Sequence, residues 1–262
     1  MNRNIIPFAL CCAPFLVNAA DSGATGAAAE PSTITASAEL GLLYKTGNTR
    51  SADVKAGLDF KWEEDVWRST LALDMLVKKS EQSDEGGDDS LETTDQKWTI
   101  ESKTNYTLEK DGKNYIYGDI AYENNRFSSY DHQSSISMGW GRQWYKSEDT
   151  SFFADIGPGY KRDVTRETDD NPSETLSSFI IQAQALYVTK INEHVEFKQS
   201  LSAKFAPKSD ENDKYKAETS ITTKLIETLQ LKFSFTVDHN SIVEEGDEKT
   251  ETQTAMTLVY SF

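Results

Sequence analysis

Residues 51–62 of this 262-residue chain read SADVKAGLDFKW, and this stretch decides the fold class. One alternate set of positions carries apolar side chains, and the other carries polar or small ones. The apolar set is Val54, Ala56, Leu58, Phe60 and Trp62. Because successive side chains of a β-strand point to opposite faces, a period of two over this length indicates a strand with one apolar and one polar face.

The same alternation recurs along the chain and predicts about twelve strands. They are expected at 34–45, 51–62, 66–78, 94–108, 114–124, 133–145, 151–161, 177–189, 194–206, 214–226, 229–239 and 250–262. These ranges exceed the roughly 5–6 residues of a typical globular strand. They match the roughly 9–11 residues that a tilted strand needs to cross a bilayer.

The connections between these strands alternate in length. Short ones are expected at 63–65, 109–113, 146–150, 190–194 and 226–228, and longer polar ones at 80–94, 125–132, 162–175, 207–214 and 240–249. The first connection, 46–50, is an exception, because it is short although it belongs with the longer set. Outer-membrane barrels have short periplasmic turns and longer extracellular loops. The sequence therefore predicts an all-β, antiparallel up-and-down transmembrane β-barrel of the bacterial outer-membrane type. A soluble secreted β-domain would explain the alternation, but not the strand lengths or the sorting of the connections.

The N-terminal segment predicts export. Residues 1–20 combine Arg3, a short apolar run and small residues at Ala19 and Ala20, as in a secretory signal peptide. Residues 21–33 are small and polar and indicate a flexible linker, so that 34–262 form the barrel. Cys11 and Cys12, the two cysteines of the chain, fall within the signal. A lipidated cysteine is an alternative, but the small residue normally found beside one is missing.

Aromatic residues on the apolar phase flank the short connections. We expect them to form an interfacial girdle in the outer membrane, in contact with lipid and lipopolysaccharide. The set is Trp62, Trp67, Tyr106, Trp144, Phe152, Tyr187 and Phe197. The chain ends on TAMTLVYSF (254–262), which predicts the strand that closes the barrel. Its Tyr260 and Phe262 resemble the C-terminal aromatic signal by which such barrels reach the barrel assembly machinery.

Three longer stretches resemble a known family. They are LLYKTGNTRSADVKAGLDF (42–60), ENNRFSSYDHQSSISMGWGRQ (123–143) and DIGPGYKRD (155–163). Together with the barrel-like end, they are similar to the salt-induced outer-membrane proteins typified by YdiY, whose domain is of unknown function. The resemblance implies an outer-membrane location and a link to salt or envelope stress. It brings no catalytic, metal or cofactor-binding residues, and no cofactor is expected.

Charge separates the predicted lumen from the predicted loops. Acids and bases are about equally frequent on the inward phase, whereas the formal net charge of the chain is -16. A ring of one sign selects ions of the other sign, so a mixed lumen predicts a narrow, weakly selective pore or a plugged structural barrel. The acidic excess lies in the long loops, where it disfavours nucleic acid. Loose capture of divalent cations there is a further possibility.

A hydrolase is the alternative from another class. His132 and Ser134 lie two residues apart near the loop end of a predicted strand, and this spacing is similar to the His-x-Ser pair of outer-membrane phospholipase A. A serine nucleophile also needs a group that orients the histidine. In that family an asparagine on the next strand orients the histidine, and the next strand of this chain has no asparagine. The glycine that follows the serine in that family is also missing from this chain. We therefore expect no enzymatic activity.

Overall fold

The computed structural model describes residues 32–45, 51–83, 89–110, 112–126, 128–167, 172–208, 210–244 and 247–262. The predicted signal peptide and nearly all of the predicted linker lie outside the described residues. Within the described ranges, no helix is long and apolar enough to cross a membrane.

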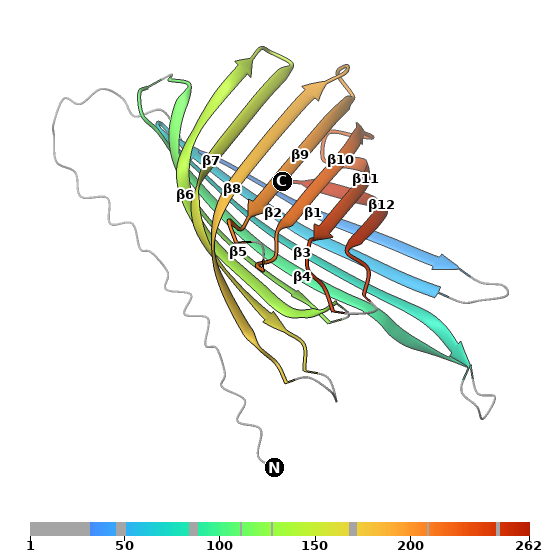
Figure 1. The fold of residues 1–262 in the computed structure, drawn as a ribbon. Helices are drawn as coiled ribbons and strands as arrows, with labels where there is room; N and C mark the ends of the chain where they lie inside the picture. The colour runs from blue at the N-terminus through green and yellow to red at the C-terminus, as the bar shows by residue number, and fades with distance from the viewer. Residues whose placement is uncertain are drawn as a thin grey trace, which may run out of the picture.

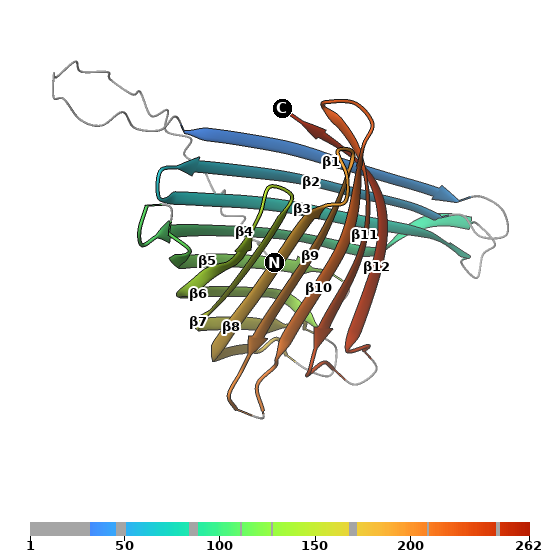
Figure 2. The ribbon, with the colours of Figure 1, turned by 90° about the horizontal axis from the view of Figure 1, so that it is seen from above.

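Twelve antiparallel strands close into one barrel, as predicted (Figure 1). Their bounds are β1 Thr33–Lys45, β2 Ser51–Glu64, β3 Trp67–Ser83, β4 Asp89–Thr107, β5 Asn114–Asn125, β6 Tyr130–Lys146, β7 Thr150–Thr165, β8 Thr175–Lys190, β9 Val195–Phe205, β10 Lys214–Lys224, β11 Leu229–Asn240 and β12 Thr250–Ser261. Strands on the near and far walls cross at a steep angle in Figure 2, as the tilt of barrel strands requires.

The two ends of the barrel differ less in connection length than predicted. We call the end that holds the β2–β3, β4–β5, β6–β7, β8–β9 and β10–β11 connections the turn end, and the opposite end the loop end. At the loop end, the predicted connection 80–94 is mostly strand, because β3 and β4 keep pairing as far as Ser83↔Asp89. Backbone pairing does not require an apolar face, so the polar sequence there did not reveal this extension. The β5–β6 connection is also shorter than predicted, at 126–129.

The apolar phase faces outward and the polar phase faces inward. Leu58 of β2 is 52% exposed and Phe233 of β11 is 47% exposed, although both lie in the middle of their strands. In contrast, Gln182 of β8 and Asp119 of β5 face inward and are 0% and 1% exposed. An apolar exterior around a polar interior is the reverse of a water-soluble fold and is what a surrounding bilayer requires.

Glycines form a tight corner between β6 and β7. A Cβ on Gly157 would lie 2.0 Å from the carbonyl oxygen of Met138, and one on Gly139 would lie 2.3 Å from that of Ile156. Only residues without a side chain allow this approach. Across the corner, the side-chain amide of Gln182 on β8 donates a hydrogen bond of 3.1 Å to Asp119 on β5.

The seam between β1 and β12 is the shortest ladder of the barrel. Its pairing runs from Ser37↔Ser261 to Leu40↔Leu258, whereas β1 and β2 pair from Thr33↔Glu63 to Lys45↔Ser51. The backbone N–H of Phe262 extends the seam with a hydrogen bond of 3.1 Å to the carbonyl of Ala36. The C-terminal residue therefore takes part in closing the barrel.

A charge on the outer face should prevent assembly. Leu58→Arg places a cation on the apolar face near the middle of β2, which costs about 2–4 kcal/mol at the bilayer midplane. The matched control is Thr99→Arg, because Thr99 lines the lumen and pairs with Asp74 and Glu123 on its two neighbouring strands. On unboiled gels, we expect the compact barrel band to fall for Leu58→Arg and to persist for Thr99→Arg. The opposite result would show that the two faces are wrongly assigned.

Removal of Phe262 should impair assembly in the cell. The deletion takes away the seam hydrogen bond to Ala36. It also removes the ring contact with Tyr260, in which the centroids of the Tyr260 and Phe262 rings are 5.2 Å apart. We expect lower levels of assembled barrel and more degradation, measured by fractionation of cells. Phe262→Tyr keeps an aromatic terminal residue and should assemble normally. Normal levels of assembled barrel in the deletion variant would show that Phe262 is not needed for assembly.

Candidate functional site in the barrel lumen

Four charged side chains link opposite walls near the loop end, and we call them the closing network. Lys97 of β4 lies 3.0 Å from Glu123 of β5 and 2.8 Å from Asp238 of β11. Lys214 of β10 lies 2.8 Å from the same Glu123. Because β4 and β5 lie opposite β10 and β11 in the twelve-strand order, the Lys97–Asp238 and Lys214–Glu123 ion pairs cross the lumen.

Polar contacts continue the closing network toward the loop end. Gln133 of β6 accepts a hydrogen bond of 2.7 Å from Lys214 and donates one of 3.1 Å to Asp163 of β7. Asp163 also pairs with Lys161, whose ammonium donates a hydrogen bond of 2.7 Å to the carbonyl of Asn212 in the β9–β10 connection. The loop end is therefore crossed by a connected set of side chains from both walls.

The β11–β12 connection reaches across the loop end. The hydroxyl of Tyr130 on β6 donates a hydrogen bond of 2.7 Å to the carbonyl of Ile242. The backbone N–H of Glu244 donates one of 3.0 Å to the hydroxyl of Ser129. Since β6 and β11 are far apart in the strand order, these bonds hold a connection from one wall against the other wall.

A second polar cluster lies toward the turn end. Asp155 of β7 accepts hydrogen bonds from Lys103 of β4 at 2.6 Å and from the hydroxyl of Tyr115 on β5 at 3.0 Å. Lys103 also donates to Gln184 of β8. Arg68 of β3 pairs with Glu63 at 2.6 Å. The glycine corner brings these strands close enough for their side chains to meet.

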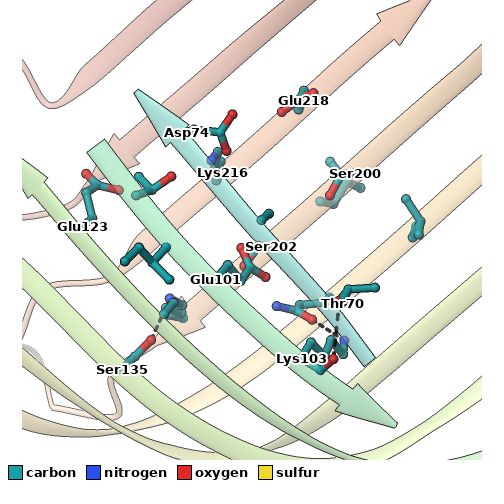
Figure 3. Close-up of a pocket in the computed structure, with 18 of the residues that line it drawn as sticks. Thr70, Asp74, Glu101, Lys103, Glu123, Ser135, Ser200, Ser202, Lys216 and Glu218 are labelled. Carbon is teal, nitrogen blue, oxygen red and sulfur yellow. Dashed lines mark hydrogen bonds between the residues drawn. The ribbon is translucent and has the colours of Figure 1, made fainter. Parts of the chain in front are cut away.

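A cavity of about 400 Å³ lies between the two clusters. Figure 3 shows part of the lining of this cavity, including Thr70 and Asp74 of β3, Glu101 and Lys103 of β4, and Lys216 and Glu218 of β10. The whole lining of the cavity carries six acids and eight bases, so neither sign dominates. The arrangement can hold water and a small polar solute. Both signs occur around the described lining, so the charges do not form a closed ring of one sign, which is the arrangement that selects strongly among ions.

The period-two pattern placed most of these residues on the inward phase, but Lys161, Asp163 and Lys214 were not assigned to the lumen. Lys161 and Lys214 are the end residues of the expected strands 151–161 and 214–226, and Asp163 lies beyond the first of them. In the structure, β7 continues to Thr165 and β10 begins with an inward-facing Lys214. The alternation itself indicated the inward position of Lys214, because Lys214, Lys216 and Glu218 are spaced two residues apart and therefore share one face of β10.

The predicted girdle residues lie at the turn-end portions of their strands. The rings of Trp67 and Tyr106 are 4.8 Å apart, and those of Tyr187 and Phe197 are 6.3 Å apart. The remaining members occupy the same part of β2, β6 and β7, namely Trp62, Trp144 and Phe152. Their contact with a membrane interface, and the role of Tyr260 and Phe262 as an assembly signal, stay predictions.

The candidate hydrolase pair faces outward. Gln133 and Ser135 point into the lumen, so His132 and Ser134 lie on the other face of β6. The Nδ1 atom of His132 is 3.2 Å from the carboxylate of Asp131, and its ring stacks on Tyr122 at 5.8 Å. Within the described ranges, the Ser134 hydroxyl forms no hydrogen bond to His132. Asp131 thus provides a carboxylate beside His132, a partner that the sequence analysis did not identify. The hydrogen bond that would connect His132 to Ser134 is not formed.

The acidic loops can be assessed only in part. Residues 84–88, 168–171 and 245–246 carry much of their charge and lie outside the described residues. Among the residues that are described, no group of three or more His, Cys, Asp or Glu side chains could hold a metal ion. Capture of divalent cations by these loops stays a prediction.

The chain is similar in sequence or in arrangement to several known proteins. The chain is 25% identical to the uncharacterized protein YdiY of Escherichia coli (strain K12) over 222 residues, covering 84% of this chain and 80% of that protein. Solved structures with a similar arrangement include an outer-membrane channel from Pseudomonas putida F1, with TM-score 0.46 and 10% identity over 93% of this chain and 100% of the other. The translocator domain of the autotransporter NalP from Neisseria meningitidis gives TM-score 0.44 and 7% identity over 91% and 89% of the two chains.

A family model matches residues 38–262, which include nearly the whole barrel. Its description is a protein of unknown function, DUF481. The same stretches that carry the resemblance in the sequence fall within this match. The chain therefore belongs to the DUF481 family of proteins of unknown function.

Proposed function

We propose that this protein is an integral barrel of the cell outer membrane that forms a narrow, weakly selective pore. The observation that carries the proposal is a charged cavity of about 400 Å³ inside a closed barrel whose outer face is apolar. A barrel with only a structural role could fill its interior with paired side chains. Here the central cavity keeps water-accessible charged groups, which favours passage of small polar solutes.

The closing network sets the size of the proposed pore. Ion pairs from Lys97 and Lys214 cross the lumen, and Tyr130 holds the β11–β12 connection against the opposite wall. The described side chains thus narrow the lumen at the loop end to less than a porin-sized opening, and solutes pass when these contacts open. We place the loop end outside the cell, because both chain ends of such barrels lie at the periplasmic turns.

A plugged structural barrel is the second candidate, and the cross-lumen contacts favour it. If the closing network does not open, the protein strengthens the envelope without conducting. We also propose a link to salt or osmotic stress, which rests on the family resemblance alone. Divalent cations and lipopolysaccharide are proposed partners of the acidic loops, on the basis of the charge of those loops.

Planar-bilayer recording of the purified barrel tests the pore. We expect small conductance steps with a slight cation preference from the acidic loops, which should fade between 0.1 M and 1 M salt as the Debye length falls from about 10 Å to about 3 Å. Tyr130→Phe combined with Ser129→Ala removes the bonds to Ile242 and Glu244 and should lengthen the open times. Tyr145→Phe, on an exposed ring outside the network, is the control.

Two results would contradict this proposal. Silence of both the wild type and the loop-contact variant would support the plugged structural barrel. Large currents with strong anion selectivity would show that the described lumen is not the conducting path.

Hydrolase activity is not expected. Ser134→Ala should leave phospholipid turnover by the purified protein at the level of the wild type, because no hydrogen bond activates the serine through His132. Fatty-acid release from vesicles, measured with and without calcium, checks this expectation. Release by the wild type that Ser134→Ala abolishes would establish the enzyme and overturn the expectation.

A further inference from the structure

Six charged side chains of the cavity have no ion-pair partner among the residues that the structure describes. The acids are Asp59, Asp74 and Glu101, and the lysines are Lys198, Lys204 and Lys216. Lys204 donates a hydrogen bond of 2.8 Å to the hydroxyl of Ser135. The other charges that line the cavity are all paired, for example Lys103 with Asp155 and Lys232 with Glu218. Within the lining of the cavity, these six charges are therefore the ones without an ion pair.

The six charges are sorted by sign onto opposite walls. Asp59, Asp74 and Glu101 belong to β2, β3 and β4, whereas Lys198 and Lys204 belong to β9 and Lys216 to β10. In the closed strand order, β2 and β9, β3 and β10, and β4 and β9 are each five steps apart out of a possible six. A negative wall therefore faces a positive wall across the cavity.

The opposing charges attract one another without touching. Each acid has a lysine on the opposite wall: Asp59 on β2 and Lys198 on β9, Asp74 on β3 and Lys216 on β10, and Glu101 on β4 and Lys204 on β9. Among the described residues, no ion pair joins the two members of any of these couples. Figure 3 shows Asp74 and Lys216 on the two sets of strands that make these walls.

We infer that the cavity takes up small zwitterionic solutes, with their ammonium group toward Asp59, Asp74 and Glu101 and their carboxylate toward Lys198, Lys204 and Lys216. This rests on the proposed pore. Charge-assisted hydrogen bonds to both walls replace the hydration of both ends of such a molecule. A cavity of about 400 Å³ is near the lower limit for ligand sites and suits a solute of amino-acid size.

Other classes of solute gain less from this arrangement. A simple anion or cation is attracted by one wall and repelled by the other. An uncharged polyol forms hydrogen bonds with the charged groups of both walls, but it carries no charge of its own and so forms no ion pair with either wall. The two walls together therefore favour a molecule that carries both signs a short distance apart.

Swelling of liposomes that contain the purified full barrel tests the inference. L-threonine is the zwitterionic probe and erythritol is the uncharged probe of similar size. We expect threonine to enter about threefold faster than erythritol, the effect of one solvated ion pair. Asp74→Asn with Lys216→Gln removes one opposing pair at constant net charge and should bring the two rates close together. Asp59→Asn with Lys198→Gln is a second, independent pair that should act in the same direction.

The matched control is Lys224→Gln with Glu227→Gln, which removes one base and one acid at the exposed turn end of β10. It should keep the wild-type ratio of the two rates. Equal entry of threonine and erythritol in the wild type would overturn the zwitterion inference and leave the pore intact. Entry of neither solute would overturn the proposed pore itself. An unchanged ratio in both cavity variants would show that these charges do not select the solute.

Discussion

The pairing of every backbone N–H and C=O group is the constraint on which this structure depends. In hydrocarbon, no water is present to satisfy an open sheet edge, so strands can cross a bilayer only in a closed barrel. Closure of β1 onto β12 removes the edge, although this ladder is the shortest of the twelve. The N–H of the last residue, Phe262, adds one more bond to the seam. The outward apolar phase and the inward polar phase both follow from that closure.

Closure of the barrel places many charged side chains in a confined interior. Some of these side chains form ion pairs and others do not. Near both ends, carboxylates and ammonium groups pair directly, as Glu123 does with Lys97 and Lys214. In the central cavity, three acids on one wall face three lysines on the other without forming ion pairs, beside other charges that are paired. Breaking a buried pair by removing one partner costs about 3–5 kcal/mol, so the paired ends hold the walls together. The unpaired centre is free to interact with a solute.

The glycine corner shows how backbone geometry positions the lumen. Gly139 and Gly157 allow β6 and β7 to approach more closely than strands with side chains could. As a result, Asp119 on β5 and Gln182 on β8 form a hydrogen bond across two intervening strands. The same closeness brings Lys103, Tyr115 and Asp155 into one cluster. No pairwise feature of the sequence identifies these partners, because they lie on four different strands.

By itself, the sequence determined the fold class, the number of strands and the face to which most side chains point. These properties follow from local alternation, which reports the orientation of each residue relative to its own strand. Tertiary structure alone decided which lysine meets which acid, that β7 extends to Thr165 and so brings Asp163 into the lumen, and that the β11–β12 connection reaches Tyr130. Such contacts join residues distant in the chain, and they depend on barrel closure, strand register and the bend at the glycine corner, none of which a period of two encodes.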